Sequence, residues 1–368
     1  MRAPRAKSAA LTGLTTLCAA VLAAGCASAH RMQAPRADPP PSAPPPARRA
    51  VLERRLRVRA GVVDMTIAKG DLWVAGFGAV SRIDPATGRL LARIAIAAVG
   101  DLSQIAAAGG SIWVTSADGV YRIDDATNRV VAAVDTGRGA TLGITAGAGR
   151  IWVTRPGEGA GEVLAIDPRT NRVAGPPIAV GPGPARLAYG TGSAWVLDTA
   201  PLAVQRIDPA TASATTPAAL ATASATTPTA LATALSASSQ AGAIAAGDGS
   251  LWVTSTDRLT RFDPSTGRVL ATLRIARAGE LAIAGTAAWV LGEPRSRSPT
   301  RFYPIKNTAR LWQITPCATA TAIVGPPFRL NLNEPIAVAA GSRYVWVAGF
   351  PDSLIELRLI PGASRRRC

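Results

Sequence analysis

Short apolar runs that alternate with polar positions recur along the chain, and turn-forming residues separate them. The most regular run contains a Trp-Val pair, and it follows a run that ends in Ile-Ala or a close variant. Successive pairs lie 40, 39, 43, 57, 37 and 57 residues apart. Alternation in short runs predicts half-buried strands, and a period near forty predicts the blades of a propeller. The pairs begin at Trp73, Trp113, Trp152, Trp195, Trp252, Trp289 and Trp346.

The residues around each pair predict where the strands turn. A glycine stands three positions before the Trp in five of the seven copies, which suits the positive φ of a two-residue hairpin. After the Trp-Val run, a third run ends in Arg-Ile-Asp-Pro or a variant, followed by Thr and then Gly or Asn. Asp caps such a turn, Pro sets φ, and the last residue accepts a left-handed conformation. A fourth run, such as residues 89–96, completes the blade.

The last copy lacks its fourth strand. It contains runs at residues 336–340, 344–349 and 353–360, and then ends in an Arg-rich tail at 363–368. Residues 52–59 precede the first inner strand, where a fourth strand would stand. We therefore predict an all-β fold, a seven-bladed β-propeller of four-stranded blades over residues 51–362, closed by an N-terminal strand that completes the last blade.

The order Trp-Val, then Arg-Ile-Asp-Pro-x-Thr-Gly/Asn, resembles the repeats of the YVTN and virginiamycin B lyase-like propellers. The resemblance covers about residues 51–360 and implies a seven-bladed propeller. It also implies a reaction in which a histidine general base acts beside a carboxylate-held magnesium ion. The chain has one histidine, His30, which precedes every blade, so the lyase reaction is not expected here. A shared fold does not imply a shared activity.

The first 25 residues read as a lipoprotein signal peptide. A basic start is followed by an apolar run at residues 9–24, and Leu22-Ala23-Ala24-Gly25-Cys26 resembles a lipobox. Cys26 would then carry the lipid, residues 26–50 would form a Pro-rich tether, and the protein would be anchored to the outer face of a bacterial cell membrane. The alternative is an ordinary secretory signal, cleaved for example after Ala29.

The net charge of +17 falls to +14 once the three basic residues of the signal peptide are removed. For an exported protein this favours anionic lipid or an anionic envelope polymer over nucleic acid. Seven of the eight Trp recur at one repeat position, which indicates packing rather than base stacking. The arginines of residues 48–59 either contact such a polyanion or form a solvated edge. We expect a monomer.

Two insertions and two cysteines leave alternatives open. Residues 212–240 hold an Ala/Thr/Ser-rich tandem duplication, expected to be a loop rather than a site. Residues 293–308 are basic and aromatic, and they form either a partner contact or a solvated excursion. Cys317 and Cys368 either form a disulfide in the oxidising exterior or leave the tail cysteine unpaired.

Charged residues that do not repeat stand at the starts of the inner strands. The candidate set consists of Asp64, Asp101, Glu280, Glu334 and Arg186. The four acids belong to blades that become consecutive once the ring closes, and Arg186 faces them from blade four. Such an arrangement would suit Ca²⁺ or Mg²⁺, or a cationic or zwitterionic ligand. The alternative is that strand starts are solvent-exposed and simply accept acids.

Three functions follow from these features. The leading one is a non-catalytic binding or interaction module for a ligand, an envelope polymer or a protein partner. The second is a metal-dependent enzyme of the lyase or lactonase type that uses the acidic residues. The third is a structural or assembly protein of the cell envelope.

Overall fold

The computed structural model describes residues 48–58, 61–98, 100–137, 139–157, 159–199, 202–211, 213–215, 241–255, 257–292, 309–316, 321–323, 326–332, 335–349 and 352–361. These residues belong to one compact unit, Pro45–Cys368, and they contain strands but no helix. No helix in this part of the chain is long and apolar enough to cross a membrane. The predicted signal peptide, most of the tether, the 293–308 insertion and the tail lie outside the described residues, as do Cys26, His30, Cys317, Glu334 and Cys368.

The first four blades each run from an inner to an outer strand. Blade 1 contains β2 (Asp64–Ala68), β3 (Asp71–Gly76), β4 (Ala79–Ile83) and β5 (Leu90–Ala95). Blade 2 contains β6 (Leu102–Ala108), β7 (Ser111–Ser116), β8 (Gly119–Asp124) and β9 (Arg129–Val134). Blade 3 contains β10 (Ile144–Gly147), β11 (Arg150–Arg155), β12 (Gly161–Asp167), β13 (Arg172–Val173) and β14 (Ile178–Val180). Blade 4 contains β15 (Pro184–Gly190), β16 (Ser193–Thr199), β17 (Leu202–Asp208) and β18 (Ser213–Thr215).

The remaining blades follow the same order. Blade 5 contains β19 (Ala241–Gly247), β20 (Ser250–Ser255), β21 (Arg258–Phe262) and β22 (Val269–Arg274). Blade 6 contains β23 (Leu281–Ala284), β24 (Ala287–Gly292), β25 (Arg310–Pro316), β26 (Thr321–Ile323) and β27 (Phe328–Arg329). Blade 7 contains β28 (Pro335–Ala340), β29 (Tyr344–Gly349), β30 (Ser353–Pro361) and β1 (Arg48–Arg57).

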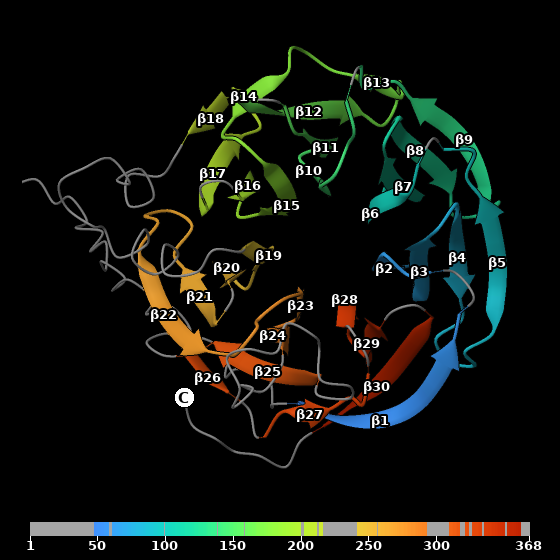
Figure 1. Cartoon of the computed structure of the whole chain (residues 1–368), viewed down its shortest axis with the longest axis vertical. Helices are drawn as coiled ribbons and strands as arrows, with labels where there is room; N and C mark the ends of the chain where they lie inside the picture. The colour runs from blue at the N-terminus through green and yellow to red at the C-terminus, as the bar shows by residue number, and fades with distance from the viewer. Residues whose placement is uncertain are drawn as a thin grey trace, which may run out of the picture. The chain divides into compact units, whose positions relative to one another are not determined.

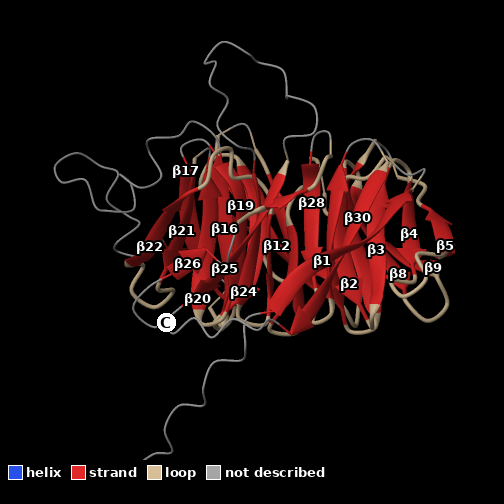
Figure 2. Cartoon of the chain, turned by 90° about the horizontal axis from the view of Figure 1, so that it is seen from below, coloured by secondary structure: helices blue, strands red, loops and turns tan. Residues whose placement is uncertain are grey.

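The seven antiparallel sheets form a ring, with the innermost strand of every blade around the central axis (Figure 1). In blades 3 and 6 the outer strand is divided in two, because β14 joins β13 against β12 and β27 joins β26 against β25. Seen edge-on, the strands cross the thickness of the ring (Figure 2). We call the face where the inner strands begin the proximal face, and the face that carries the Asp-Pro turns the turn face. The predicted seven-bladed propeller is confirmed.

The N-terminal strand closes the ring, as predicted. β1 pairs antiparallel with β30, from Arg48 opposite Pro361 to Arg57 opposite Ser353, with a bulge between Leu52 and Arg54. The strand starts at Arg48, ahead of the expected start at residue 52. The last blade is therefore built from both ends of the propeller sequence, and β1 covers the edge of β30 that would otherwise be unpaired.

The hairpin turns have the backbone geometry that their sequences predict. Gly70, before the first Trp-Val strand, has φ of 89°, and Asn128, at the end of an Asp-Pro-type turn, has φ of 56°. The residue before the hairpin glycine is also left-handed, which the sequence did not show: Thr191 has φ of 52°. Two positive φ values in succession are typical of a type I′ hairpin.

The hydrophobic core lies between blades, and the repeated Trp is its largest element. All seven Trp side chains are almost completely buried. Trp73 of blade 1 packs with Ile112 and Val114 of blade 2, and Trp346 of blade 7 packs with Leu72 and Val74 of blade 1. The repeated Trp therefore joins each blade to its neighbour, which explains why it recurs in every blade.

The repeated arginine forms a clamp between blades. The guanidinium of Arg82 lies 5.1 Å from the ring of Trp73, and that of Arg122 lies 5.1 Å from the ring of Trp113. Arg122 also donates hydrogen bonds to the Pro168 carbonyl and the Asn171 side chain in the turn of the next blade, at 2.6 and 2.8 Å. Stacking on an aromatic face and donating from a planar fork are properties of arginine that lysine does not share.

Candidate functional site

Three of the predicted site residues occupy the same structural position in three different blades. Asp64 lies opposite Ala75, and Arg186 lies opposite Leu197, in each case two residues after the blade's Trp. The carbonyl of Glu280 accepts a hydrogen bond from the amide of Leu291, which is likewise two residues after a Trp. Asp64 and Arg186 lie on innermost strands and Glu280 directly precedes one, so all three stand at one level near the proximal face.

Arg186 and Glu280 form an ion pair between blades 4 and 6. Nη2 of Arg186 lies 2.5 Å from Oε1 of Glu280. The two residues come from blades that are not neighbours, since blade 5 stands between them. The side chains remain 31% and 20% exposed, so solvent reaches the pair. Two backbone amides hold the Asp64 carboxylate. It accepts hydrogen bonds from the amide of Met65 at 2.8 Å and from the amide of Ile105, in blade 2, at 3.0 Å.

The surrounding protein makes the two carboxylates harder to ionise. Desolvation raises the pKa of Asp64, although the charge of Arg186 and the two amide hydrogen bonds oppose this shift. Desolvation also raises the pKa of Glu280, and the nearby charge of Asp64 raises it further, against the opposing effect of Arg186. The three groups therefore interact electrostatically across the axis. With all three charged they carry a net charge of −1, and we call them the axial triad.

The other two predicted residues do not join the axial triad. Asp101 is exposed ahead of β6, and Glu334 lies outside the described residues. In blade 7 the equivalent position is Ala337, which lies opposite Ala348. In blade 3 it is Gly143, whose carbonyl accepts a hydrogen bond from the amide of Thr154. Among the described residues no three His, Cys, Asp or Glu side chains are grouped so as to hold a metal ion.

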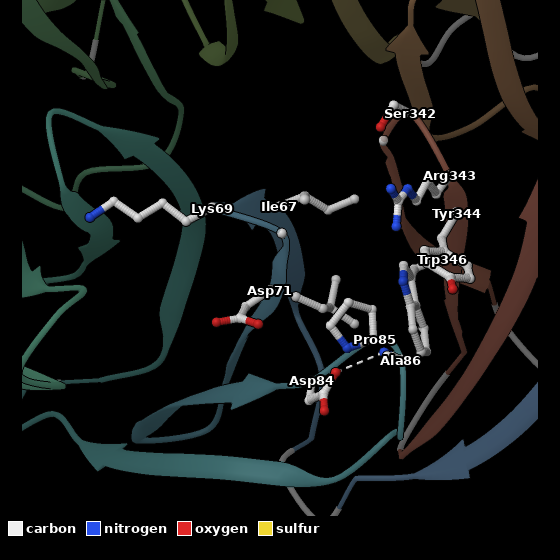
Figure 3. A pocket seen from close by; sticks show the side chains of 13 residues that line it. Ile67, Lys69, Asp71, Asp84, Pro85, Ala86, Ser342, Arg343, Tyr344 and Trp346 are labelled. Atoms are coloured by element: carbon white, nitrogen blue, oxygen red, sulfur yellow. Dashed lines mark hydrogen bonds between the residues drawn. The ribbon is translucent and has the colours of Figure 1, made fainter.

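A cavity of about 360 Å³ lies on the turn face, between blades 7 and 1. Figure 3 shows Arg343, Tyr344 and Trp346 along one wall, with Asp84, Pro85 and Ala86 across from them. Lys69 and Asp71 point away from Trp346 in this view. Lys69 forms an ion pair with Asp125, and Asp71 forms one with Arg82.

This cavity lies where the arginine clamp is altered. Glu356 stands opposite Trp346, the place that Arg82 takes opposite Trp73. The arginine beside this position in blade 7 is Arg54, which comes from the outer strand β1. Its Nη2 donates to the carbonyl of Ala86 at 2.9 Å, and its Nε lies 3.5 Å from the fully buried Glu356. The Trp346 indole therefore has Glu356 instead of the repeated arginine opposite it, and the cavity lies beside this indole.

Asp198 is a buried acid away from the axial triad, and sequence reasoning missed it. It lies on β16 with no exposed surface. Its Oδ2 accepts a hydrogen bond from Gln205 at 2.6 Å, while its buried Oδ1 has no hydrogen-bond partner among the residues that the structure describes. Burial raises its pKa to about 6. The only sequence signal is an acid at the end of a Trp-Val strand, where other blades have Gly, Ser or Arg.

We expect Asp198→Asn to stabilise the protein at neutral pH. A carboxyl whose folded pKa exceeds its unfolded value favours folding only while protonated, so its contribution is complete below about pH 4 and is lost by about pH 6. The substitution should raise the free energy of unfolding by roughly 2 kcal/mol at pH 7.5 and leave it almost unchanged at pH 4. Thermal or urea unfolding at both pH values measures this, with Asp101→Asn as the exposed control. An equal effect at both pH values would contradict the prediction.

Comparison with known proteins supports the fold. No protein-family model matches the chain, and no curated protein matches it in sequence. Among solved structures, a WD40-like chain from the crystal structure of a mitotic checkpoint complex superposes with a TM-score of 0.65 at 14% sequence identity. The match covers 89% of this chain and 98% of that chain. At this identity the similarity shows the propeller fold alone, a fold often used as a scaffold for protein interactions.

Proposed function

We propose that the protein is an exported, lipid-anchored propeller of the YVTN type that acts as a binding module without lyase chemistry. The lipobox before Cys26 and the Pro-rich tether support export and anchoring. The repeated Trp and Arg residues are used in packing, so they are not available as a site. The sole histidine precedes the propeller, so no histidine base can act from a blade.

The observation that carries the proposal is the convergence of Asp64, Arg186 and Glu280 at the axis. None of the three repeats from blade to blade, so the fold does not require them at that position. Two carboxylates that are costly to ionise would gain from a positive ligand group, and Arg186 offers a donor to a negative one. The net charge of −1 favours a small cationic or zwitterionic ligand that replaces the internal ion pair.

An organic ligand suits the axial triad better than a metal ion. The guanidinium of Arg186 occupies the Glu280 carboxylate, and a bare metal ion next to it would meet electrostatic repulsion, whereas a zwitterion can place its own anionic group on the guanidinium. Among the described residues, Asp101 and the two acids do not form a group that could hold a metal ion. The geometry of the described residues therefore favours binding over metal-dependent lyase or lactonase chemistry. The assembly hypothesis rests on the 293–308 insertion, which lies outside them.

The proposal is tested by calorimetric titration of the full chain with choline, L-arginine and glycine betaine as organic cations and zwitterions, and with CaCl₂ and MgCl₂. We expect saturable binding of at least one organic probe, weakened about tenfold or more in Asp64→Asn and in Glu280→Gln, because each removes a charge-assisted contact. Asp101→Asn, an acid near the same face but outside the triad, is the matched control. Equal binding by wild type and triad variants, or no binding of any probe, would exclude the axial site. Binding of Ca²⁺ or Mg²⁺ alone would restore the enzyme hypothesis.

A further inference from the structure

Exposed aliphatic side chains gather on three neighbouring outer strands. Eight large hydrophobic residues are exposed among the described residues, and six of them form three adjacent pairs. Their exposed fractions run from 38% to 52%. The pairs are Val51 and Leu52 on β1, Leu90 and Leu91 on β5, and Val130 and Val131 on β9. β1, β5 and β9 belong to blades 7, 1 and 2 and follow one another along the outer edge of the ring (Figure 1).

The pairs also lie at a similar level of the ring. β1, β5 and β9 are all outermost strands and run in the same direction, away from the turn face. Leu90 is the first residue of β5, and Val130 is the second residue of β9, directly after the turns. Val51 is the fourth residue of β1. The six side chains therefore lie along the half of the rim that borders the turn face, and we call this area, with its arginines, the rim patch.

Arginines alternate with these aliphatic pairs. Arg89, Arg93 and Arg129 are exposed on or beside β5 and β9. Within the described residues Arg93 and Arg129 form no ion pair, and β5 and β9 contain no acidic residue. Arg55 and Arg57 are exposed on β1. β1 also contains one acid, Glu53. Arg93 and Arg129, which have no ion-pair partner among the described residues, and the other exposed arginines therefore lie beside exposed aliphatic chains on a surface that is both positive and apolar.

We infer that the rim patch binds the headgroup layer of an anionic phospholipid bilayer. Arginine pairs with lipid phosphates while neighbouring aliphatic side chains enter the boundary of the acyl region. An anionic polymer would use the arginines but would gain nothing from Val and Leu. A protein interface would have to desolvate guanidinium groups that have no partner, which is costly.

The path of the chain agrees with this orientation. β1 begins at Arg48, so the chain enters the propeller from the turn-face side, and Cys26 lies only 22 residues earlier. The inference rests on the proposed function for the presence of a nearby membrane, but not on lipidation itself. With the rim patch on the bilayer, the turn face is the side nearer the membrane, and the axial triad near the proximal face is directed away from it.

The outer strand of blade 5 provides a matched control. Val269 and Leu270 begin β22 at the place of Leu90 and Leu91, yet they are half-buried rather than exposed. Arg268 and Arg274 are exposed on or beside this strand. Charge reversal there tests the effect of net charge without touching the rim patch.

The experiment is vesicle co-sedimentation of a chain that starts at residue 27, which lacks the lipidated cysteine and retains the compact unit Pro45–Cys368. We expect binding to phosphatidylcholine vesicles that contain phosphatidylglycerol and none to phosphatidylcholine alone. Arg93→Glu/Arg129→Glu should weaken binding at least tenfold, since each surface arginine contributes about a fivefold factor. Leu91→Ser/Val131→Ser should also weaken it severalfold, whereas Arg268→Glu/Arg274→Glu should change it little.

Three results would overturn the inference. The first is a lack of binding to the anionic vesicles at low salt. The second is unchanged binding by the serine variant, which would indicate a purely electrostatic polyanion surface. The third is a dimer in light scattering that the serine variant dissociates, which would assign the patch to a second copy of the chain. Palmitate labelling of wild type and Cys26→Ala tests the anchor separately, so its failure would leave the vesicle result intact.

Discussion

Deletion of residues 48–57 is expected to abolish cooperative folding of the propeller. β1 covers the edge of β30 along nine paired positions, and Ala50 on it is part of the core between blades 6 and 7. Without β1, blade 7 loses its outer strand and Glu356 is left buried beside an open edge. The expected loss is comparable with the whole stability of a domain, roughly 5–15 kcal/mol. Circular dichroism melts and binding of a hydrophobic dye measure it.

The deletion should be reversible in trans. A peptide with the sequence of residues 48–57 supplies the missing strand and should restore a cooperative melt. The same peptide with Arg54→Glu is the control, because it places a carboxylate opposite Glu356. A deletion variant that melts as cooperatively as wild type, or rescue by both peptides alike, would show that closure by β1 does not hold the ring together.

Arg54→Met is expected to destabilise the protein by about 3 kcal/mol, because it removes a guanidinium that compensates a buried carboxylate. Glu356 has no exposed surface, and Nε of Arg54 lies 3.5 Å from it. Arg54 is itself 27% exposed, which places the effect at the lower end of the range for buried pairs. Urea unfolding of the variant measures the loss.

A double variant separates the ion pair from simple packing. Arg54→Met/Glu356→Gln replaces both charges and should recover most of the lost stability, since a neutral pair needs no counter-ion. Arg57→Met, on the same strand but exposed, should change the free energy of unfolding by less than about 0.5 kcal/mol. If Arg54→Met costs no more than Arg57→Met, the ion pair does not stabilise the closure.

The sequence predicted the parts of the fold that repeat. Trp73 and its six counterparts, the hairpin glycines and the Asp-Pro turns each recur because every blade solves the same packing problem, so one alignment identifies all of them. Ring closure could be predicted as well, since a missing fourth strand at one end matched a spare strand at the other. These features follow from local sequence patterns, so they can be predicted without knowing which distant residues are in contact.

The axial triad could be predicted only in part, because its members share a fixed distance to the Trp of their blade and not to the Ile-Ala step. Counting from the Ile-Ala step places Asp64 and Glu280 three residues before the Ile, and Arg186 only one residue before the corresponding Leu. The bulge between Pro184 and Arg186 lies before Arg186, so it does not move Arg186 relative to Leu187. Counted from the Trp instead, Asp64, Arg186 and Glu280 each stand nine residues earlier. The same count in blade 2 gives Gln104, so Asp101 falls outside the triad.

Features that arise from a departure in a single blade were not predicted. Asp198 and Glu356 each replace an ordinary residue at a repeat position, and only the structure shows that both are buried. Their partners, Gln205 and Arg54, lie on neighbouring strands, so the pairing follows from sheet order.

The pairing of β1 with β30, which we call the seam, also sets the order in which the chain can assemble. Arg48 and Pro361 are 313 residues apart, whereas the strands of the other blades follow one another directly. Closing so long a loop costs conformational entropy before its contacts form, so we expect blades 1 to 6 to assemble first and the seam last. During that interval the edges of β1 and β30 stand unpaired, with Ala50 and Leu357, which are buried in the closed ring, uncovered. The half-assembled ring is then prone to join the β1 of one chain to the β30 of another, and dilution should favour the closed monomer over such swapped chains.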